Sequence, residues 1–170
     1  MNYRLERLGP EHRLNVAEIY NVHAREGYAA YSEETVDGSF YDLLRGMIRD
    51  YPALAVKSPE GEVVGFSYMR AYSYIPALSR LARLTYFLLP AHTGNGVGTL
   101  LLAHFEKSAP LLGVDALVAD VCSLNEQSLA FHRARGFVEA GRFARAGRKF
   151  NRDFDIVWMQ KLLPPVHPAN

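Results

Sequence analysis

The chain has 170 residues, a length typical of one domain and sufficient to bury a hydrophobic core. Its 49% hydrophobic and 22% charged residues are those of a globular protein and exclude a disordered chain. The 19 Lys and Arg residues and 18 Asp and Glu residues leave a formal charge of +1, so no overall field draws the chain toward nucleic acid or an anionic membrane.

The first half of the chain predicts a strand, two helices and a pair of strands. Residues 3–8 alternate as a strand does, and Gly9-Pro10 opens a helix with an apolar side. Apolar residues at helical spacing predict a second helix over residues 40–50. Residues 53–57 and 63–72 then read as two antiparallel strands joined by a tight turn.

The second half begins with a long strand over residues 80–89, which stops at Pro90. A helix is predicted from Gly96, and Pro110 kinks or ends it. One apolar face of this helix is traced by Val97, Leu100, Leu101, Phe105, Leu111 and Leu112.

A further strand over residues 116–121 precedes a helix that Asn125 caps and Gly136 closes. Residues 137–144 and 154–162 form a final hairpin. The order β-α-α-β-β-β-α-β-α-β-β predicts an α/β (α+β) fold, with a mostly antiparallel sheet, one parallel pair and flanking helices. We expect one domain over residues 1–163 and a tail over residues 164–170.

A glycine-rich segment joins the end of a central strand to the start of a helix: Thr93-Gly94-Asn95-Gly96-Val97-Gly98-Thr99. Unpaired backbone N–H groups and the positive end of the helix dipole converge there, which favours an anion such as a phosphate. Glycines let the backbone approach that anion closely. The alternative interpretation is a turn that serves packing alone.

Other phosphate-binding motifs match this segment less well. A Walker-type loop requires Gly-Lys-Ser/Thr, and no lysine lies between Thr93 and Leu102. A dinucleotide fingerprint starting at Gly94 has Thr99 in place of its third glycine, although Asp115 and Asp120 lie near the distance of a ribose-binding acid.

A family resemblance rests on the spacing of this glycine segment and the helix behind it. Gly94-x-Gly96-x-Gly98, followed by Asn125, Ser128, His132 and Gly136-Phe137, resembles the GNAT N-acyltransferase superfamily. The run through His132-Arg133, Lys149-Phe150 and Met159-Gln160 is similar to its phosphinothricin and methionine sulfoximine acetyltransferase branch.

The resemblance implies acetyl-CoA bound in a V-shaped opening between two central strands. Its carbonyl would be held by main-chain groups of Tyr86, Phe87 and Leu88. Residues Gly94, Asn95, Gly96, Val97, Gly98 and Thr99 would hold the pyrophosphate. Asn125 and Ser128 would meet the pantetheine arm, and His132 would lie near the sulfur. A homodimer is also implied.

The sequence departs from the branch at two places. His92 and Thr93 stand where glutamine or arginine is usual, which removes a phosphate-directed side chain. Arg83 replaces a glutamate that helps to deprotonate the acceptor in relatives, and arginine is no base at neutral pH. With Arg83 at this position, the sequence does not identify the acceptor amine or the residue that acts as the general base.

Acetyl transfer to an amine requires groups that accept and donate protons. His132 titrates near neutral pH and suits the leaving sulfur, although a half-buried histidine on a helix is also common. Glu33 and Asp120 are the candidate proton acceptors. We expect Tyr31, Glu33, Tyr72 and Arg83 to bind the acceptor amine.

Several other features favour ordinary structural roles. The histidines show no metal-ligand spacing, so no metal is predicted. Cys122 is predicted to be a core residue, and as the single cysteine it forms no intramolecular disulfide. Because the N-terminal residues also lack the apolar run of a signal peptide, we expect a cytoplasmic protein. No apolar stretch reaches the ~20 residues of a membrane span. A basic cluster in the last hairpin, Arg142 to Arg152, reads as a solvated face or a contact to the 3′-phosphate of CoA, with nucleic acid disfavoured.

The sequence thus predicts direct acetyl transfer from acetyl-CoA to the primary amine of a small molecule, an amino acid or an analogue. Two alternatives stay open. One is a non-catalytic acyl-CoA-binding or interaction module on the same fold, which Arg83 makes plausible. The other is acetylation of a protein or peptide amine.

Overall fold

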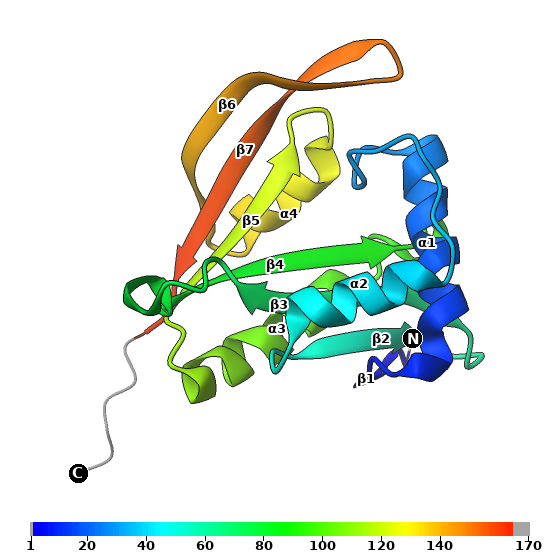
Figure 1. The fold of residues 1–170 in the computed structure, drawn as a ribbon, viewed down its shortest axis with the longest axis horizontal. Coiled ribbons are helices and arrows are strands. Elements are labelled where there is room, and N and C mark those ends of the chain that lie inside the picture. The colour runs from blue at the N-terminus through cyan, green and yellow to red at the C-terminus, as the bar shows by residue number, and fades with distance from the viewer. Residues whose placement is uncertain (1, 165–170) are drawn as a thin grey trace.

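The computed structural model describes residues 2–164, which form one sheet with helices on both faces (Figure 1). The strands are β1 (Arg4–Arg7), β2 (Ala53–Lys57), β3 (Val63–Ala71), β4 (Leu81–Leu88), β5 (Ala116–Cys122), β6 (Val138–Lys149) and β7 (Arg152–Leu162). The helices are α1 (Arg13–Glu26), α2 (Ser39–Ile48), α3 (Val97–Ser108) and α4 (Glu126–Ala134). The predicted order of helices and strands is confirmed.

The seven strands lie in the order β1-β2-β3-β4-β5-β7-β6. Neighbouring strands are antiparallel except β4 and β5, which are parallel and joined through α3. The predicted mixed sheet with one parallel pair is therefore confirmed. Of the predicted tail over residues 164–170, only Pro164 lies within the described residues. No helix among residues 2–164 is both long and apolar enough to cross a membrane.

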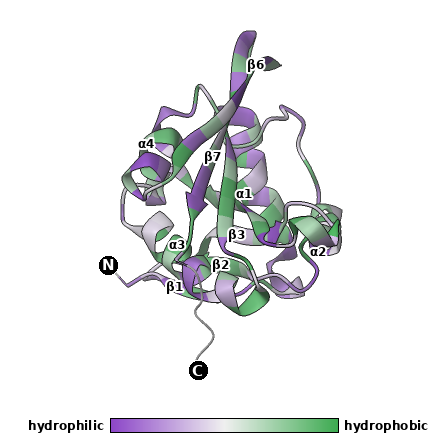
Figure 2. Ribbon diagram, turned by 90° about the vertical axis from the view of Figure 1, so that its left-hand side faces the viewer, coloured by the Kyte–Doolittle hydropathy of each residue, from purple (hydrophilic) through white to green (hydrophobic). Residues whose placement is uncertain are grey.

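Two hydrophobic clusters cover the two faces of the sheet. On one face, α1 and α2 pack over Phe66 and Phe87. On the other, α3 and α4 pack over Leu117 and Met159, so both faces of the central strands are apolar. Figure 2 shows the hydropathy of each residue along the ribbon. The central strands β4 and β5 are thereby fixed between two layers of helices.

The helix α3 ends at Ser108, as Pro110 predicts, and a 3-10 turn over Ala109–Leu112 follows. Of the predicted apolar face, Val97, Leu101 and Phe105 are buried, whereas Leu100, Leu111 and Leu112 are exposed. The change from 3.6 to about 3.0 residues per turn rotates the last residues out of line with the core. The prediction of a continuous apolar face was wrong there.

The last hairpin is longer than the sequence predicts, because β6 continues to Lys149 and β7 begins at Arg152. Phe150 and Asn151 form the turn, with φ of 49° and 57°. Two positive φ values define a type I′ hairpin turn, for which Asn-Gly is the usual signal. The sequence lacks that signal, so residues 145–153 were not predicted as strand.

Candidate functional site

The site lies where the two parallel central strands separate. β4 and β5 pair only through Leu81–Arg83 and Ala116–Val118, and beyond these residues the strands diverge (Figure 1). A cavity of about 390 Å³ opens between the diverging halves. The facing edges of the two strands have backbone groups that are free of each other and available to a ligand. The predicted opening between two central strands is therefore present.

The cavity has walls from four parts of the chain. One wall is α4, with its N-cap Asn125 and with Ser128 and His132. A second is the loop after α1, residues 28–32, and a third is the apolar side of α2. The diverging parts of β4 and β5 complete it. Asn125 accepts the Ser128 N–H at 3.1 Å through Oδ1, which leaves its amide NH₂ for a ligand.

Three buried polar atoms in the described part of the chain have no hydrogen-bond partner: Arg83 Nε, Tyr86 Oη and His132 Nε2. All three residues line this one cavity. A buried polar group without a partner costs roughly 1–3 kcal/mol, so such groups are rare in folded proteins. A polar ligand in this cavity would offer hydrogen-bond partners to these residues.

His132 is buried and held in one orientation. Its Nδ1 lies 2.7 Å from the carbonyl oxygen of Ser128, which can only accept, so Nδ1 carries the proton. Burial lowers the pKa of His132 and favours the neutral ring. Nε2 is therefore a proton acceptor at the cavity. A donation from His132 to sulfur, as the sequence predicts, requires that Nε2 first gain a proton.

We expect the free energy of unfolding to fall as the pH drops below about 6.5, the ordinary pKa of histidine. Because the pKa of His132 is lowered in the folded state, the unfolded chain takes up a proton first. The stabilisation is complete above the pKa that His132 has in the unfolded chain, and it is lost as the pH falls toward the pKa in the folded state. The loss is about 1.4 kcal/mol for each pH unit that separates the two pKa values.

Urea denaturation across this range checks the prediction. The variant His132→Gln should lose part of the pH dependence, whereas His104→Gln, a change at an exposed histidine of α3, should keep it. Identical pH profiles for the wild type and His132→Gln would contradict the assignment.

Arg83 and Asp120 form an ion pair at the floor of the cavity. Arg83 Nη2 donates to Asp120 Oδ2 at 2.7 Å, and Tyr31 donates to the same oxygen at 2.9 Å. Nε lies 2.5 Å from Oδ1, but its N–H is not directed at that oxygen, which leaves it without a hydrogen bond. Arg83 also faces Arg70 across β3 and β4, where like charges repel, and Asp120 offsets that repulsion.

The glycine segment forms an open cradle at the start of α3. Gly94 and Gly96 have φ of 75° and 79°, and a Cβ at either position would meet no atom within 4 Å. Gly96 is the N-cap, and no side chain caps the first N–H groups of the helix. The cradle thus has free donors and open space, as an anion requires.

Gly98 serves a different purpose from the other two glycines. It lies inside α3, where a Cβ would come within 3.0 Å of the Phe131 ring of α4. Gly98 therefore permits close packing of α3 on α4, which was the alternative interpretation for the whole segment. Thr93 Oγ1 donates to Pro90 O at 2.8 Å and does not add a donor to the cradle.

Two predicted acceptor-binding residues do not line the cavity. Glu33 is exposed and accepts the backbone N–H of Phe150 at 2.9 Å. Tyr72 is 44% exposed and packs edge-on against Trp158. On the cofactor side, Tyr86 and Phe87 line the cavity, whereas the Leu88 carbonyl accepts from His23 Nε2 at 2.7 Å.

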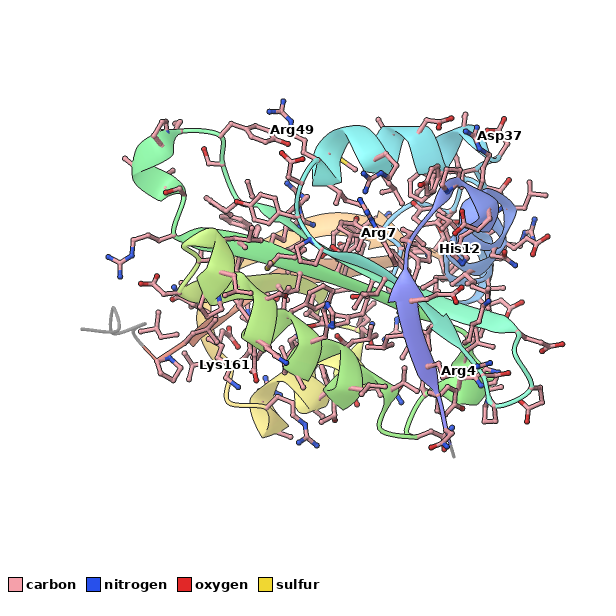
Figure 3. All side chains as sticks on the ribbon, turned by 90° about the horizontal axis from the view of Figure 1, so that it is seen from below. Arg4, Arg7, His12, Asp37, Arg49 and Lys161 are labelled. Atoms are coloured by element: carbon pink, nitrogen blue, oxygen red, sulfur yellow. The ribbon has the colours of Figure 1, made fainter. Side chains whose placement is uncertain are left out.

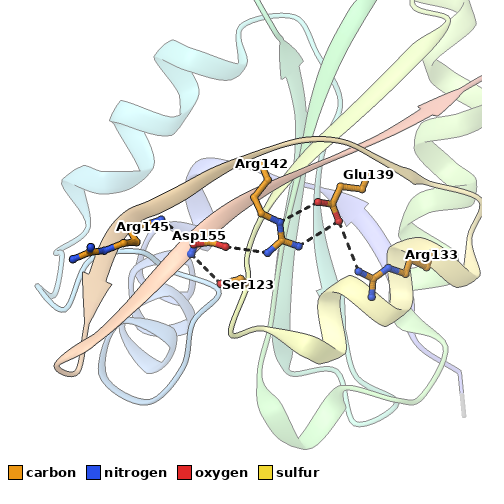
Figure 4. A network of polar contacts seen from close by, with 6 residues as sticks. All are labelled: Ser123, Arg133, Glu139, Arg142, Arg145 and Asp155. Carbon is orange, nitrogen blue, oxygen red and sulfur yellow. Dashed lines mark hydrogen bonds and ion pairs between the residues drawn. The ribbon is translucent and has the colours of Figure 1, made fainter.

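The predicted basic cluster of the last hairpin is not a free cationic face. Arg142 lies between Glu139 and Asp155, both within 3.0 Å (Figure 4). Arg145 and Arg148 both pair with Asp153. These acidic partners neutralise the three arginines, so they offer little to a phosphate. Arg152 is exposed, forms no ion pair with residues 2–164 and lies over the Tyr28 ring.

Lys149, the remaining lysine of that cluster, is fully buried. Its Nζ donates to backbone carbonyls of residues 23, 27 and 30, more than 100 positions earlier in the chain. Sequence reasoning missed this role, because no local pattern distinguishes a buried lysine from a solvated one.

A second cavity of about 300 Å³ lies between α3 and α4, near the cradle. Thr99, Arg135 and Lys161 are among its lining residues. Lys161 of β7 is labelled in Figure 3. Its Nζ donates to Glu106 of α3 and to the Arg135 carbonyl. Because Lys161 pairs with Glu106, Arg135 is the cationic side chain of this groove that forms no ion pair with residues 2–164.

A mixed sheet that opens between two parallel strands, with a glycine cradle at the next helix, defines the acyl-CoA N-acyltransferase class. The sequence profile of the Acetyltransferase (GNAT) family matches residues 16–137. The chain belongs to this family and is an acetyltransferase, which confirms the resemblance inferred from the sequence.

Several characterised proteins are similar over most of the chain. The L-amino acid N-acyltransferase MnaT of Escherichia coli (strain K12) is 28% identical over 149 residues, 85% of each chain. A phosphinothricin N-acetyltransferase of Alcaligenes faecalis is 33% identical over 153 residues, 87% of this chain and 76% of that one. A GNAT superfamily phosphinothricin acetyltransferase from Sinorhizobium meliloti, solved with AcCoA, has a TM-score of 0.89 and 27% identity, covering 96% of this chain and 89% of that one.

Proposed function

We propose that this protein transfers the acetyl group of acetyl-CoA to the primary amine of a small molecule, an amino acid or an analogue. The observation that supports this most is the set of three unpartnered buried polar atoms at one cavity between β4 and β5. The substrate class is supported by similar proteins named for L-amino acids and for phosphinothricin.

The residues of the cradle and cavity fit acetyl-CoA. Backbone N–H groups from Gly94 to Thr99 would hold the pyrophosphate, as free donors at a helix start favour. The free amide of Asn125 and the Ser128 hydroxyl would meet the pantetheine arm. Main-chain groups of Tyr86 and Phe87, which line the cavity, would meet the thioester. Arg135 is a better candidate for the 3′-phosphate than the paired arginines of the hairpin or than Lys161, which pairs with Glu106.

The chemistry requires one proton to leave the amine and one to reach the sulfur. As the bond from the amine nitrogen to the acetyl carbon forms, Asp120 accepts the proton. Asp120 passes this proton through water to Nε2 of His132, which carries no proton in the resting state. As the carbon–sulfur bond breaks, Nε2 delivers the proton to the sulfur, and both residues return to their starting states. Glu33 has no part in these steps, because it lies outside the cavity.

The acceptor side of the cavity combines a polar floor with an apolar wall. Phe40, Leu44 and Met47 of α2 provide the wall. At the floor, the Arg83 guanidinium supplies positive charge toward an acceptor carboxylate, and it also pairs with Asp120 through Nε and Nη2. An amino acid with an uncharged side chain matches this arrangement.

An assay of thiol release over a panel of amines and peptides tests the proposed function. Turnover with an amino acid or analogue is the expected result. CoA binding without turnover on any amine would instead support the non-catalytic module. Turnover with peptide amines alone would support acetylation of a protein.

We also propose a cytoplasmic homodimer. The buried Cys122 has a free thiol, which is consistent with a reducing compartment. β6 is an edge strand, and its side chains Val138 and Phe143 are 66% and 61% exposed. An exposed apolar edge of this kind is often covered by a second chain. Light scattering that gives the mass of a single chain would contradict the dimer.

A further inference from the structure

Lys149 is a buried ammonium that joins the last hairpin to the loop after α1. Its side chain is 0% exposed. Nζ donates to the carbonyls of His23 at 2.8 Å, Gly27 at 2.6 Å and Ala30 at 2.7 Å. An ammonium has three N–H donors, so each one has a partner.

Burial of this charge is costly. No carboxylate among residues 2–164 forms an ion pair with Lys149, and burial lowers the pKa of its ammonium. Two factors oppose the cost: hydrogen bonds from a charged donor are strong, and a helix C-terminus favours a cation. A hydrophobic side chain would fill the same space without a desolvation penalty. What Lys149 provides, and a hydrophobic side chain would not, is a set of hydrogen bonds that fixes the position of the loop after α1.

The turn next to Lys149 is strained, and the same loop holds it. Phe150 has a φ of 49°, which is rare for a bulky residue. Its N–H donates to Glu33, and its ring packs against the Tyr28 ring, with 5.7 Å between the ring centroids. Backbone strain persists only where surrounding contacts enforce it, and it concentrates at ligand sites. The hairpin turn and the loop therefore fix each other.

The loop held in this way forms the acceptor wall. Residues 28–32 all line the cavity. Tyr31 stacks on Phe154 of β7 and donates to Asp120 at 2.9 Å. None of these contacts involves the cradle over residues 93–99. The contacts of Lys149 thus lead to the acceptor side of the site and not to the anion cradle.

We propose that Lys149 is a positioning residue for the acceptor: it holds residues 27–33 so that Tyr31 binds Asp120 and the loop forms one wall of the acceptor site. This inference rests on the proposed function, because it concerns the same cavity. The groups that Lys149 contacts are neutral backbone carbonyls, so its effect on the site is geometric. Loss of the three hydrogen bonds from Lys149, which we call the Lys149 clamp, lets residues 27–33 move, whereas the cradle over residues 93–99 keeps its shape.

The variant Lys149→Met, which keeps the length of the side chain and removes its donors, tests this role. We expect the KM for the acceptor to rise about tenfold or more, since even a shift of ~1 Å in a positioned group lowers rates strongly. The Kd for acetyl-CoA should stay within about twofold. Arg148→Met, at the exposed neighbouring position, is the control and should match the wild type. An unchanged acceptor KM in folded Lys149→Met would overturn the proposal.

A double-mutant cycle with Tyr31→Phe separates positioning from general stabilisation. If Lys149 acts through Tyr31, the second change adds little to the acceptor KM of the first. Fully additive effects would contradict this. Hydrogen exchange gives a readout that requires no turnover: in Lys149→Met, amides of residues 27–33 should exchange faster and those of residues 93–99 should not.

Lys149→Arg is the second variant, in case Lys149→Met does not fold. It keeps the charge, but a planar guanidinium cannot meet three convergent carbonyls. Faster exchange in residues 27–33 would support the clamp; unchanged exchange, or failure of both variants to fold, would contradict it. If the wild type acetylates no amine, the proposed function is wrong. The hydrogen-exchange result would still show whether Lys149 holds residues 27–33 in place.

Discussion

Gly96→Asp is expected to abolish binding of acetyl-CoA and to leave the fold intact. A Cβ at this position meets no protein atom within 4 Å, and aspartate tolerates positive φ better than most residues. The new carboxylate lies at the free N–H groups of α3, where the pyrophosphate is proposed to bind. Two unit charges 4 Å apart repel by roughly 4 kcal/mol near a protein surface, which corresponds to about a thousandfold in Kd.

Gly96→Asn is the matched control, because it has the same shape without the charge. Titration calorimetry with acetyl-CoA should show a much smaller loss for Asn than for Asp, with equal melting temperatures. Equal affinity in Gly96→Asp and the wild type would refute the cradle. Gly98 is a poorer position for this test, because a side chain there presses on Phe131 and disturbs packing as well as binding.

Asp120→Asn is expected to have the second large effect, on both stability and turnover. The change leaves Arg83 without its counter-charge, opposite Arg70. Loss of one partner from a buried pair costs about 3 kcal/mol at the low end of the known range, appropriate here because Arg83 is 26% exposed. As the proposed proton acceptor, Asp120 should also contribute about a hundredfold to the rate.

The two effects separate in a double variant. Arg83→Met combined with Asp120→Asn removes the unpaired charge, so urea denaturation should show stability close to that of the wild type. Turnover should remain low, because the proton acceptor is still absent. Full turnover in Asp120→Asn at saturating acceptor would exclude Asp120 from catalysis.

The parts of the fold that local signals encode were predicted well. Asn125 caps α4, and Gly136 follows it with a φ of 84°. Gly94 and Gly96 have the positive φ that the cradle needs. Each of these features depends on residues within one turn of a helix, which is why a single sequence carries them.

The sequence was less informative where a contact joins distant segments. Glu33 was expected at the acceptor, yet it holds the hairpin turn at Phe150, 117 positions away. Lys149 was expected on a basic surface, yet it is buried against α1. The lengths of β6 and β7 were also underestimated, because an unusual turn of Phe150 and Asn151 joins them.

The sequence by itself determined the class of fold, the order of the elements and the place of the glycine turn that is proposed to bind an anion, since periodicity, caps and glycines act over a few neighbouring residues. Only the tertiary structure decided which charged side chains reach the cavity. The ion pair of Arg83 with Asp120, the neutral His132 and the buried Lys149 depend on desolvation and on partners that folding brings together from distant positions.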